Sequence, residues 1–344
     1  MQLTDPVGTP AAATRPWPPQ PQGPGRSASR LAWYAAVARW APSKHNTQPW
    51  LFRITDHGLE FLSDPTRLLP ETDPFQRELV ISLGAAVHIA CVAARALGYT
   101  PQVELIPDGG TRCVARMVEA GAHAVTELDR DLLAAVAGRR TDRGPLDART
   151  LALSLPFELQ SLASDTGATL RLVSTPGDRA TLAALVERAD RQLAQRPEVT
   201  AELRPWLREA DDLRPDGVPI NHTRGAASYR AEFVQRDFSS PESAAAPDRV
   251  GADRPFVGVL FTQADCPLDW LVAGQALAAV LLSAHVAGAN ASYLNQPIEV
   301  PALRAQLAEG LAMSGFPQVV IRLGKGVAVA PTPRRPAEDI TVYT

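Results

Sequence analysis

The chain has 344 residues, of which 45% are hydrophobic and 21% charged, the composition of an ordinary soluble globular protein. Its length suits about two domains, or one large one, and is sufficient for a core that needs no disulfide or metal staple. The formal net charge of −3 gives no support for a nucleic-acid partner or a polybasic membrane contact. The three cysteines are far apart, which argues against a disulfide framework and predicts a cytoplasmic location.

The first part of the chain predicts an α+β arrangement. Residues 1–27 carry seven prolines, so we expect a disordered tail that buries too little apolar area to become ordered. Residues 77–97 are apolar almost all round, which predicts a central buried helix. The other expected elements are helices over 31–40 and 128–137 and strands over 50–54, 59–62, 102–106 and 113–118.

The second part predicts a loosely similar order of elements. Strands are expected over 169–173, 256–262 and 318–323, and helices over 182–193, 270–286 and 301–308. We therefore predict two related halves, 28–137 and 138–344, packed around central buried helices. The long polar stretch 211–255 between two of these elements is typical of a lid, a binding loop or disorder.

Several common classes are excluded by what the sequence lacks. The near-apolar run 271–286 is shorter than the ~20 residues of a membrane-spanning helix, and no signal-peptide core precedes it, so we expect no membrane association. The six histidines have no HxxxH or HExxH spacing, which argues against zinc. The string Gly324-Lys325-Gly326 follows a strand but opens no helix, so it fails as a dinucleotide fingerprint.

Three polar clusters remain. The first, residues 41–50, reads APSKHNTQPW, and its two prolines fix a backbone that presents hydroxyl, amide, imidazole and ammonium groups. Amide side chains both donate and accept hydrogen bonds, which suits the edge of a heterocycle. The alternative is a polar loop that joins a helix to a strand.

The other two clusters are rich in arginine. Residues 139–143 read RRTDR, which could hold a phosphate through bidentate guanidinium contacts or could be cations at a helix C-terminus. Residues 331–336 read PTPRRP, either a second basic pair for an anion or a solvated basic tail. All but two of the 34 lysines and arginines are arginine, so any anion site is expected to consist of guanidinium groups.

In combination, these clusters resemble the FMN-dependent nitroreductase superfamily. The strings APSxxNxQPW, RR[ST]xR and PRRPxED match it best in its Acg-like branch, whose members look like two fused nitroreductase halves. The segments DPFQRE at 73–78, DGVP at 216–219, AGQAL at 273–277 and GFP at 315–317 match as well. The resemblance covers about 31–342, and it implies a nitroreductase-like fold arranged as a tandem pseudo-dimer.

The resemblance also implies a set of FMN-binding residues. In the family, the loop that corresponds to 41–50 lies against the isoalloxazine ring, and the RR[ST]xR string holds the ribityl phosphate. The C-terminal arginine pair also approaches that phosphate. The backbone that follows the second buried helix lies near the flavin atom N5. The corresponding residues are Pro42, Ser43, Lys44, Asn46 and Gln48; Arg139, Thr141 and Arg143; Arg334 and Arg335; and Leu294, Asn295 and Gln296.

Each half carries only one of the two main strings, which predicts one FMN per chain between the halves. The resemblance implies an FMN-dependent oxidoreductase that transfers hydride through flavin N5 between NAD(P)H or an organic donor and a quinone, nitro or unsaturated acceptor. A biosynthetic dehydrogenase is one kind of oxidoreductase that this resemblance includes. The alternative is a flavin-sequestering protein whose 211–255 lid prevents turnover. His45, His222 and Tyr229 are candidates for a general acid, and either a monomer or a homodimer is compatible with the sequence.

Overall fold

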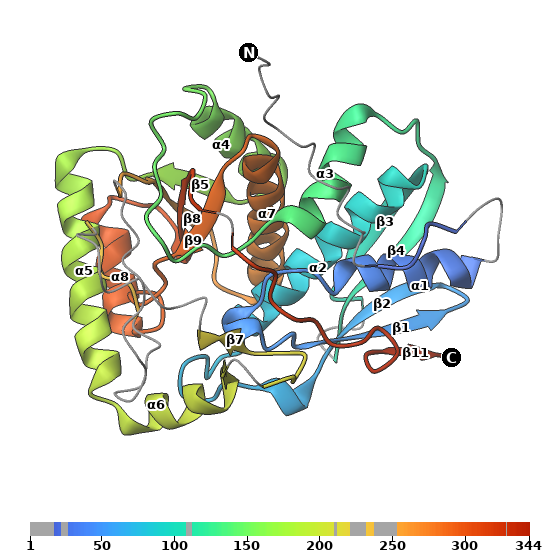
Figure 1. The fold of residues 1–344 in the computed structure, drawn as a ribbon, viewed down its shortest axis with the longest axis horizontal. Helices are drawn as coiled ribbons and strands as arrows, with labels where there is room; N and C mark the ends of the chain where they lie inside the picture. Colours follow the sequence, from blue (N-terminus) through green and yellow to red (C-terminus); the bar gives the residue numbers. More distant parts are fainter. Residues whose placement is uncertain are drawn as a thin grey trace, which may run out of the picture.

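The computed structural model describes residues 17–21, 27–107, 112–209, 212–220, 232–236, 253–327 and 329–344. Two sheets with their covering helices lie next to each other, and long helices pass between them (Figure 1). The predicted α+β class is therefore confirmed. Of the long stretch 211–255, only 212–220, 232–236 and 253–255 are among the described residues.

The first sheet has five strands in the order β11-β1-β2-β4-β3, and only the β11–β1 pair is parallel. Its strands are β1 (Trp50–Thr55), β2 (Gly58–Ser63), β3 (Tyr99–Leu105), β4 (Cys113–Ala122) and β11 (Thr341–Tyr343). Alternate residues of β1 are buried, because one face of the sheet covers the core. The last strand of the chain thus completes the sheet that its first strands form.

The second sheet has four antiparallel strands in the order β5-β8-β10-β9. These are β5 (Thr169–Leu172), β8 (Phe256–Thr262), β9 (Asn290–Tyr293) and β10 (Phe316–Gly324), and a small parallel ladder joins β6 (Leu207–Arg208) to β7 (Val218–Pro219). Nearly every residue of β8 and β10 is buried, because hydrophobic clusters cover both faces of this sheet. The sheet therefore lies inside the protein rather than at its surface.

The helices fill the space around and between the sheets. They are α1 (Ser27–Ala38), α2 (Arg77–Ala96), α3 (Glu127–Gly138), α4 (Leu155–Asp165), α5 (Pro176–Ala194), α6 (Pro197–Leu203), α7 (Pro267–Val286) and α8 (Pro301–Gly310), with short 3₁₀ turns at Lys44–Asn46, Pro65–Arg67 and Arg204–Trp206. The predicted elements are all present, most of them with shifted ends. The helices α4 and α6 and the strands β6, β7, β9 and β11 had no counterpart in the predicted order.

The two long apolar helices, α2 and α7, pack directly against each other. A Cβ atom at Gly84 would lie 2.2 Å from the Leu271 carbonyl oxygen, and one at Gly274 would lie 2.1 Å from that of Ile81. Glycine at both positions therefore lets the two backbones touch. By length and composition either helix could cross a membrane, but 83% of the apolar window of α2 and 61% of that of α7 are buried inside the protein.

The predicted disordered tail, 1–27, is wrong for the residues that the structure describes there. The Trp17 side chain is 6% exposed and packs into the core of the first sheet, and the Trp33 indole donates to the Pro18 carbonyl at 2.9 Å. Helix α1 already begins at Ser27. A composition averaged over a window misses a single indole, whose burial removes a large apolar area from water. Residues 1–16 and 22–26 lie outside the described residues.

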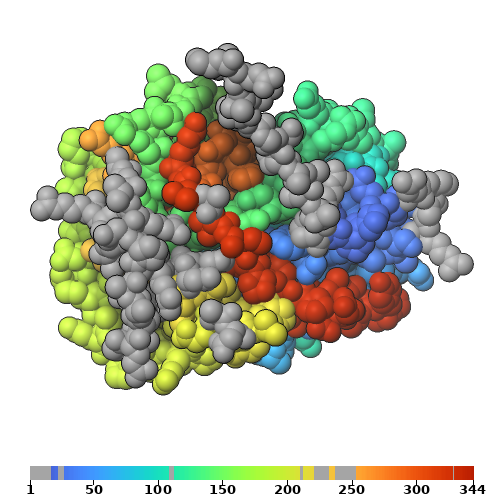
Figure 2. All heavy atoms as spheres, in the orientation of Figure 1, coloured from blue at the N-terminus to red at the C-terminus, as the bar shows by residue number. Residues whose placement is uncertain are grey.

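The C-terminal segment connects the two sheets across the surface. After β10 it runs over the face shown in Figure 2, where its red atoms pass toward the blue residues of the N-terminal part. Along the way, Arg39 donates to the Arg335 carbonyl at 2.8 Å, and the Phe52 backbone N–H donates to the Ile340 carbonyl at 2.7 Å. The segment therefore has a fixed path over both halves before β11 pairs with β1.

Candidate functional site

A cavity with a volume of about 160 Å³ is lined by residues from both the N-terminal and the C-terminal parts of the chain. Its walls come from the 41–50 loop, α2, the 139–143 stretch, α7, β9, β10 and the C-terminal segment. Ten of the thirteen residues predicted from the sequence line it: Pro42, Ser43, Lys44, Asn46, Arg139, Thr141, Arg143, Asn295, Gln296 and Arg334. Residues distant in the sequence are thus brought together at one site.

The other three predicted residues lie behind the cavity wall. Gln48 is fully buried, and its amide donates to the Pro215 carbonyl and accepts from the Arg335 backbone N–H, both at 2.8 Å. The Arg335 guanidinium instead pairs with Asp64 at 3.0 Å. Leu294 is fully buried in the hydrophobic cluster on one face of the second sheet. These side chains hold the wall in position.

The 41–50 loop adopts a strained backbone that its neighbours hold in place. His45, Asn46 and Gln48 have φ angles of 49°, 54° and 51°, in the left-handed region that side chains other than glycine rarely adopt. The Asn46 amide donates to the carbonyls of Gly217 at 2.9 Å and Pro333 at 3.1 Å. Two segments far away in the sequence therefore fix the turn that points Lys44 and His45 into the cavity.

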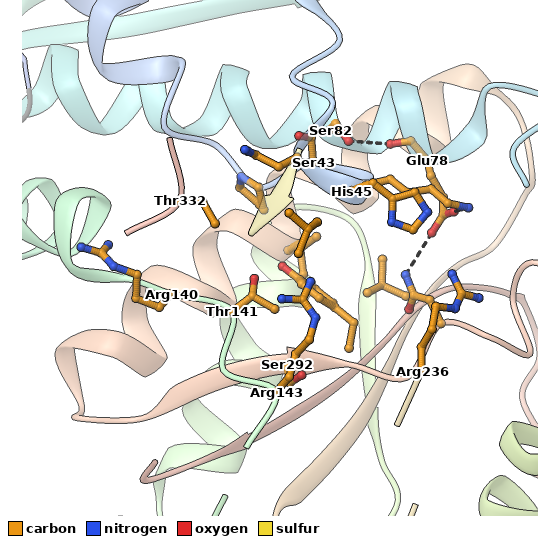
Figure 3. A pocket seen from close by; sticks show the side chains of 18 of the residues that line it. Ser43, His45, Glu78, Ser82, Arg140, Thr141, Arg143, Arg236, Ser292 and Thr332 are labelled. Atoms are coloured by element: carbon orange, nitrogen blue, oxygen red, sulfur yellow. Dashed lines mark hydrogen bonds and ion pairs between the residues drawn. The ribbon is translucent and has the colours of Figure 1, made fainter. Parts of the chain in front are cut away.

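One end of the cavity is strongly cationic. Arg139, Arg140 and Arg334 line this end, and Arg143 lies between Arg140 and Arg236 (Figure 3). In the described part of the chain, Arg139, Arg140 and Arg334 form no ion pair, and the buried Nε of each has no hydrogen-bond partner. Burial lowers the pKa of all four guanidiniums, and that of Arg143 falls to about 10. These groups remain charged at neutral pH, so the geometry calls for an anion at this end.

The helix-terminus interpretation of 139–143 also has support. The Arg140 Nη1 donates to the carbonyls of Ala137 at 2.6 Å and Arg139 at 2.8 Å, at the C-terminus of α3. Arg139 donates to the Trp40 carbonyl at 2.9 Å. These bonds use one nitrogen of each guanidinium, so a role at the helix end and a role toward an anion are compatible.

The opposite end of the cavity contains a network of opposite charges. The Lys44 ammonium contacts the Glu78 carboxylate, lies 3.3 Å from Glu299, and donates to the Thr72 carbonyl at 2.9 Å. Arg236 holds Glu299 through two hydrogen bonds of 2.7 and 3.2 Å. Burial opposes the charge of Lys44, but the two glutamates outweigh it and raise the pKa of Lys44. The Lys44 charge is therefore already balanced by the protein.

His45 lies at this end, with Glu78 and Arg236 (Figure 3). Burial and the neighbouring cations of Lys44 and Arg236 place the pKa of His45 well below its usual value. The imidazole is therefore neutral at pH 7 and cannot supply a proton as imidazolium. Of the other two candidates for a general acid, both His222 and Tyr229 lie outside the described residues.

Part of the cavity wall is apolar. Ile81 of α2, Leu277 of α7 and Val319 of β10 line the cavity together with Tyr293. Burial raises the pKa of Tyr293, so its phenol stays protonated. The amide of Asn295 donates to Glu78 at 3.0 Å, and its oxygen accepts from the Val320 backbone N–H at 2.9 Å. An apolar slot with polar groups at its edges suits a flat aromatic heterocycle.

The stretch 211–255 reaches this cavity with Val218, Gln235 and Arg236. Its first described part packs directly against the 41–50 loop, because Pro215 and Gly217 accept hydrogen bonds from Gln48 and Asn46 of that loop. The carboxylate of Asp216, which pairs with Arg67 at 2.7 Å and with Arg208, fixes this part in place.

Several residues of the cavity carried no signal in the sequence. Glu78 belongs to a matching segment, but nothing in that segment indicated a partner for Lys44. Glu299 and Arg236 lie in unremarkable surroundings, and Trp40 was expected only as the end of a helix. Their roles depend on contacts between residues distant in the sequence, since Lys44 and Glu78 are 34 positions apart and Arg236 and Glu299 are 63 apart.

Comparison with known proteins agrees with this geometry, although no protein-family model matches the chain. A protein of Mycobacterium tuberculosis named "Putative NAD(P)H nitroreductase Rv3131" is 32% identical over 314 residues, which is 88% of this chain and 88% of that protein. The protein of the same organism named "Putative NAD(P)H nitroreductase acg" is 30% identical over 306 residues, with 87% of this chain and 91% of that protein covered. "Uncharacterized protein Rv3127" is 28% identical over 314 residues.

The aligned regions cover 88% and 87% of this chain, so the similarity is not restricted to one motif. Two of these relatives are at least 30% identical to the chain and are covered over most of their own length. On this evidence, the chain belongs to the nitroreductase superfamily.

Proposed function

We propose that the protein is an FMN-dependent oxidoreductase that transfers hydride between NAD(P)H, or an organic donor, and a small organic acceptor such as a quinone, a nitro compound or an unsaturated metabolite. The observation that carries the proposal is the cavity, where Arg139, Arg140 and Arg334 form no ion pair with any described residue and apolar side chains make up part of the wall. The relatives named as nitroreductases support the reaction class.

The residues present fit FMN rather than a neutral flavin. The buried Nε atoms of Arg139 and Arg334 lack hydrogen-bond partners within the described chain, and a phosphate dianion would satisfy them. Ile81, Leu277 and Val319 would lie along the ring. When bound, FMN would supply the redox chemistry, since no side chain here can accept a hydride.

The protein's own groups would then bind the ring, orient it and exclude water. Lys44 is held by Glu78, Glu299 and the Thr72 carbonyl, so its ammonium has a fixed position in the cavity wall. The neutral His45 can donate or accept a hydrogen bond toward a substrate, but does not protonate it at pH 7. The proton for an acceptor is therefore expected from solvent or from the substrate.

We further propose that the two halves act as a pseudo-dimer with one FMN per chain. In support, Ser43 and Lys44 come from the first half, whereas Arg143 and Arg334 come from the second, and all four line one cavity. The helices α2 and α7 pack where the halves meet, and β11 joins the second half to the first sheet.

The first test is the flavin itself. Flavin released from the purified protein by denaturation is quantified by chromatography, with one FMN per chain expected. The double variant Arg139→Gln/Arg143→Gln should lose FMN affinity by tens- to thousands-fold, since each charge-assisted hydrogen bond contributes ~1.5–3 kcal/mol. Bound FAD, two FMN per chain, or unchanged affinity in the double variant would contradict the proposal.

A second candidate function is flavin storage with little turnover. It is favoured by the contribution of Val218, Gln235 and Arg236, from the stretch 211–255, to the cavity wall. Anaerobic stopped-flow reduction of the FMN-loaded protein by NADPH and by NADH separates the two functions. Rapid loss of the yellow absorbance supports an oxidoreductase, and no loss over minutes supports storage.

A further inference from the structure

The DGVP segment at 216–219 resembles that of the family, but the proposed function gives its first residue, Asp216, no role. Asp216 is 9% exposed and does not line the cavity. Its carboxylate accepts from Arg67 Nη1 at 2.7 Å and also pairs with Arg208. Burial opposes ionisation of Asp216, but the hydrogen bonds from the two arginines outweigh it and lower its pKa. Asp216 is therefore charged at neutral pH and is held by a guanidinium at each of its oxygens.

The same nitrogen of Arg67 also reaches the 41–50 loop. Arg67 Nη1 donates to the Thr47 carbonyl at 2.9 Å, and the guanidinium carbon lies 5.7 Å from the centre of the Trp206 ring. A hydrogen bond between ionised groups is roughly twice as strong as a neutral one, so Asp216 keeps Arg67 in the orientation that holds Thr47. A charge on one segment thereby fixes a backbone group of the other.

The backbone that follows Asp216 contacts the loop directly. The Gly217 N–H donates to the Asn46 carbonyl at 3.2 Å, and the Gly217 carbonyl accepts from the Asn46 amide at 2.9 Å. Gly217 has a φ angle of 75°, and a Cβ atom there would lie 2.6 Å from the Trp206 carbonyl oxygen, so this approach requires glycine. Val218 then lines the cavity. Three consecutive residues thus supply a charge, a close backbone contact and part of the cavity wall.

These contacts act on the strained part of the 41–50 loop. His45, Asn46 and Gln48 have left-handed backbone conformations, which persist only where the surrounding structure over-determines them. Ser43, Lys44 and His45 of the same loop line the cavity, and Figure 3 shows the first and last of them among the side chains around it. Loss of an anchor behind the loop is therefore expected to displace the side chains in front of it.

We propose that Asp216 is a positioning residue for the flavin, which acts through Arg67 and Gly217 to hold the 41–50 loop in the conformation that presents its side chains to the cofactor. This inference rests on the proposed function. It implies that 212–220 helps to bind the cofactor and does not merely cover it. Neither Asp216 nor Arg67 lines the cavity, so their effect on the loop should be measurable without any ligand.

The first measurement is amide hydrogen exchange of the apoprotein. It reports on the loop because the backbone N–H groups of Thr47 and Gln48 are hydrogen-bonded within it. Asp216→Asn, which keeps the size of the side chain and removes its charge, should speed exchange at 46–48 by roughly 10- to 100-fold, the effect of losing one charge-assisted hydrogen bond. Arg67→Met should do the same. Arg67→Lys keeps one charged nitrogen that can donate to both partners, so it should retain most of the protection.

The second measurement is a titration of the apoprotein with FMN, followed by flavin fluorescence, together with the visible absorption spectrum of the bound flavin. Asp216→Asn and Arg67→Met should weaken FMN binding and shift that spectrum, since the loop beside the ring changes position. Arg30→Met is the matched control, because the Arg30–Glu119 ion pair has the same N–O distance of 2.7 Å, is similarly buried and does not line the cavity. The control should lower stability toward urea, but leave exchange at 46–48 and FMN affinity unchanged.

The inference is overturned if exchange at 46–48 stays at the wild-type rate in Asp216→Asn and Arg67→Met, or if Arg30→Met accelerates it equally. It is also overturned if exchange becomes faster while FMN affinity and the flavin spectrum remain those of wild type. If wild type binds no flavin, the proposed function fails and the positioning role fails with it. The titration detects that outcome, whereas failure of the Asp216 anchor alone is detected by exchange in the apoprotein.

Discussion

The contact between α2 and α7 gives a prediction whose size can be worked from the structure. In Gly274→Ala, the new Cβ would lie 2.1 Å from the Ile81 carbonyl oxygen and 2.9 Å from the Ala85 backbone nitrogen. Ordinary contact begins near 3.4 Å, so the shortfall is about 1.3 Å. Both neighbours are backbone atoms of a buried helix, which cannot rotate out of the way as the end of a side chain can. The helices must therefore separate.

Two opposing effects determine the net change in stability. Alanine favours the helix by about 1 kcal/mol relative to glycine. Overpacking costs ~1–3 kcal/mol, and occasionally more when backbone must shift. Because backbone must shift here, the upper end of that cost applies, and we expect Gly274→Ala to lower the free energy of unfolding by about 2 kcal/mol. Because Ile81 and Leu277, on the two helices, line the cavity, FMN affinity should weaken as well.

Urea unfolding followed by circular dichroism measures the effect, with Gly177→Ala as the matched control. Gly177 lies in the first turn of α5, and the nearest atom to its Cβ position is the Thr175 hydroxyl at 4.0 Å. The control should be as stable as wild type, or more stable by up to about 1 kcal/mol. Equal stability of the two variants would refute the direct backbone contact between α2 and α7.

Three further changes probe the groups that position the cavity wall. The Glu202 carboxylate accepts hydrogen bonds from the backbone N–H groups of Glu71 and Thr72 and from the Thr72 hydroxyl, and the Thr72 carbonyl in turn accepts from Lys44. Glu202→Ala should therefore speed amide hydrogen exchange at residues 71–72. Unchanged exchange would contradict this role of Glu202. Burial opposes ionisation of Glu299, but Arg236 and Lys44 hold the pKa of its carboxyl group below the usual range. The ion pairs of Glu299 therefore stabilise the folded state at neutral pH, and this stabilisation decreases as the pH falls below about 4.3. Lys44→Met should lower the free energy of unfolding by ~3–5 kcal/mol at pH 7, measured by urea unfolding, because it leaves buried carboxylates without their partner. The difference from wild type should be smaller at pH 4, and an equal difference at both pH values would contradict this role of Lys44. Arg334 uses both terminal nitrogens, since Nη1 donates to Asn46 at 3.0 Å and to Thr332 at 2.6 Å while Nη2 donates to the Trp40 carbonyl at 3.4 Å. A lysine has one nitrogen and cannot span these partners, so Arg334→Lys should increase protease cleavage in 329–340, and unchanged cleavage would contradict this role.

Most of the fold could be predicted because its central elements have unambiguous patterns. The apolar stretch 77–97 became α2 (Arg77–Ala96), and the run 256–262 became β8 with the same ends. The elements that were missed are short or amphipathic. For example, β11 (Thr341–Tyr343) has three residues, and it is a strand only because β1 offers it an edge. Such pairing is a property of the tertiary structure that a local pattern does not encode.

The site was predictable to the extent that its residues lie in continuous strings. Seven of the ten predicted residues that reach the cavity belong to the 41–50 and 139–143 strings, each of which folds as a unit. What the strings could not indicate is which atoms are already used by the protein. The amides of Asn46 and Gln48 suited a heterocycle edge, yet both hydrogen-bond to the carbonyls of Gly217 and Pro215.

The charge of Lys44 shows why those partners matter for the chemistry. An isolated lysine next to a flavin would favour its reduced, anionic form, whereas this lysine lies between Glu78 and Glu299, which balance its charge. At the other end, Arg139, Arg140 and Arg334 have no carboxylate partner within the described chain. The positive potential of the cavity is therefore concentrated at the proposed phosphate end and not beside the proposed ring. It follows that phosphate-bearing ligands should owe their affinity to this end, and that replacing Lys44 should affect stability more than ligand charge selectivity.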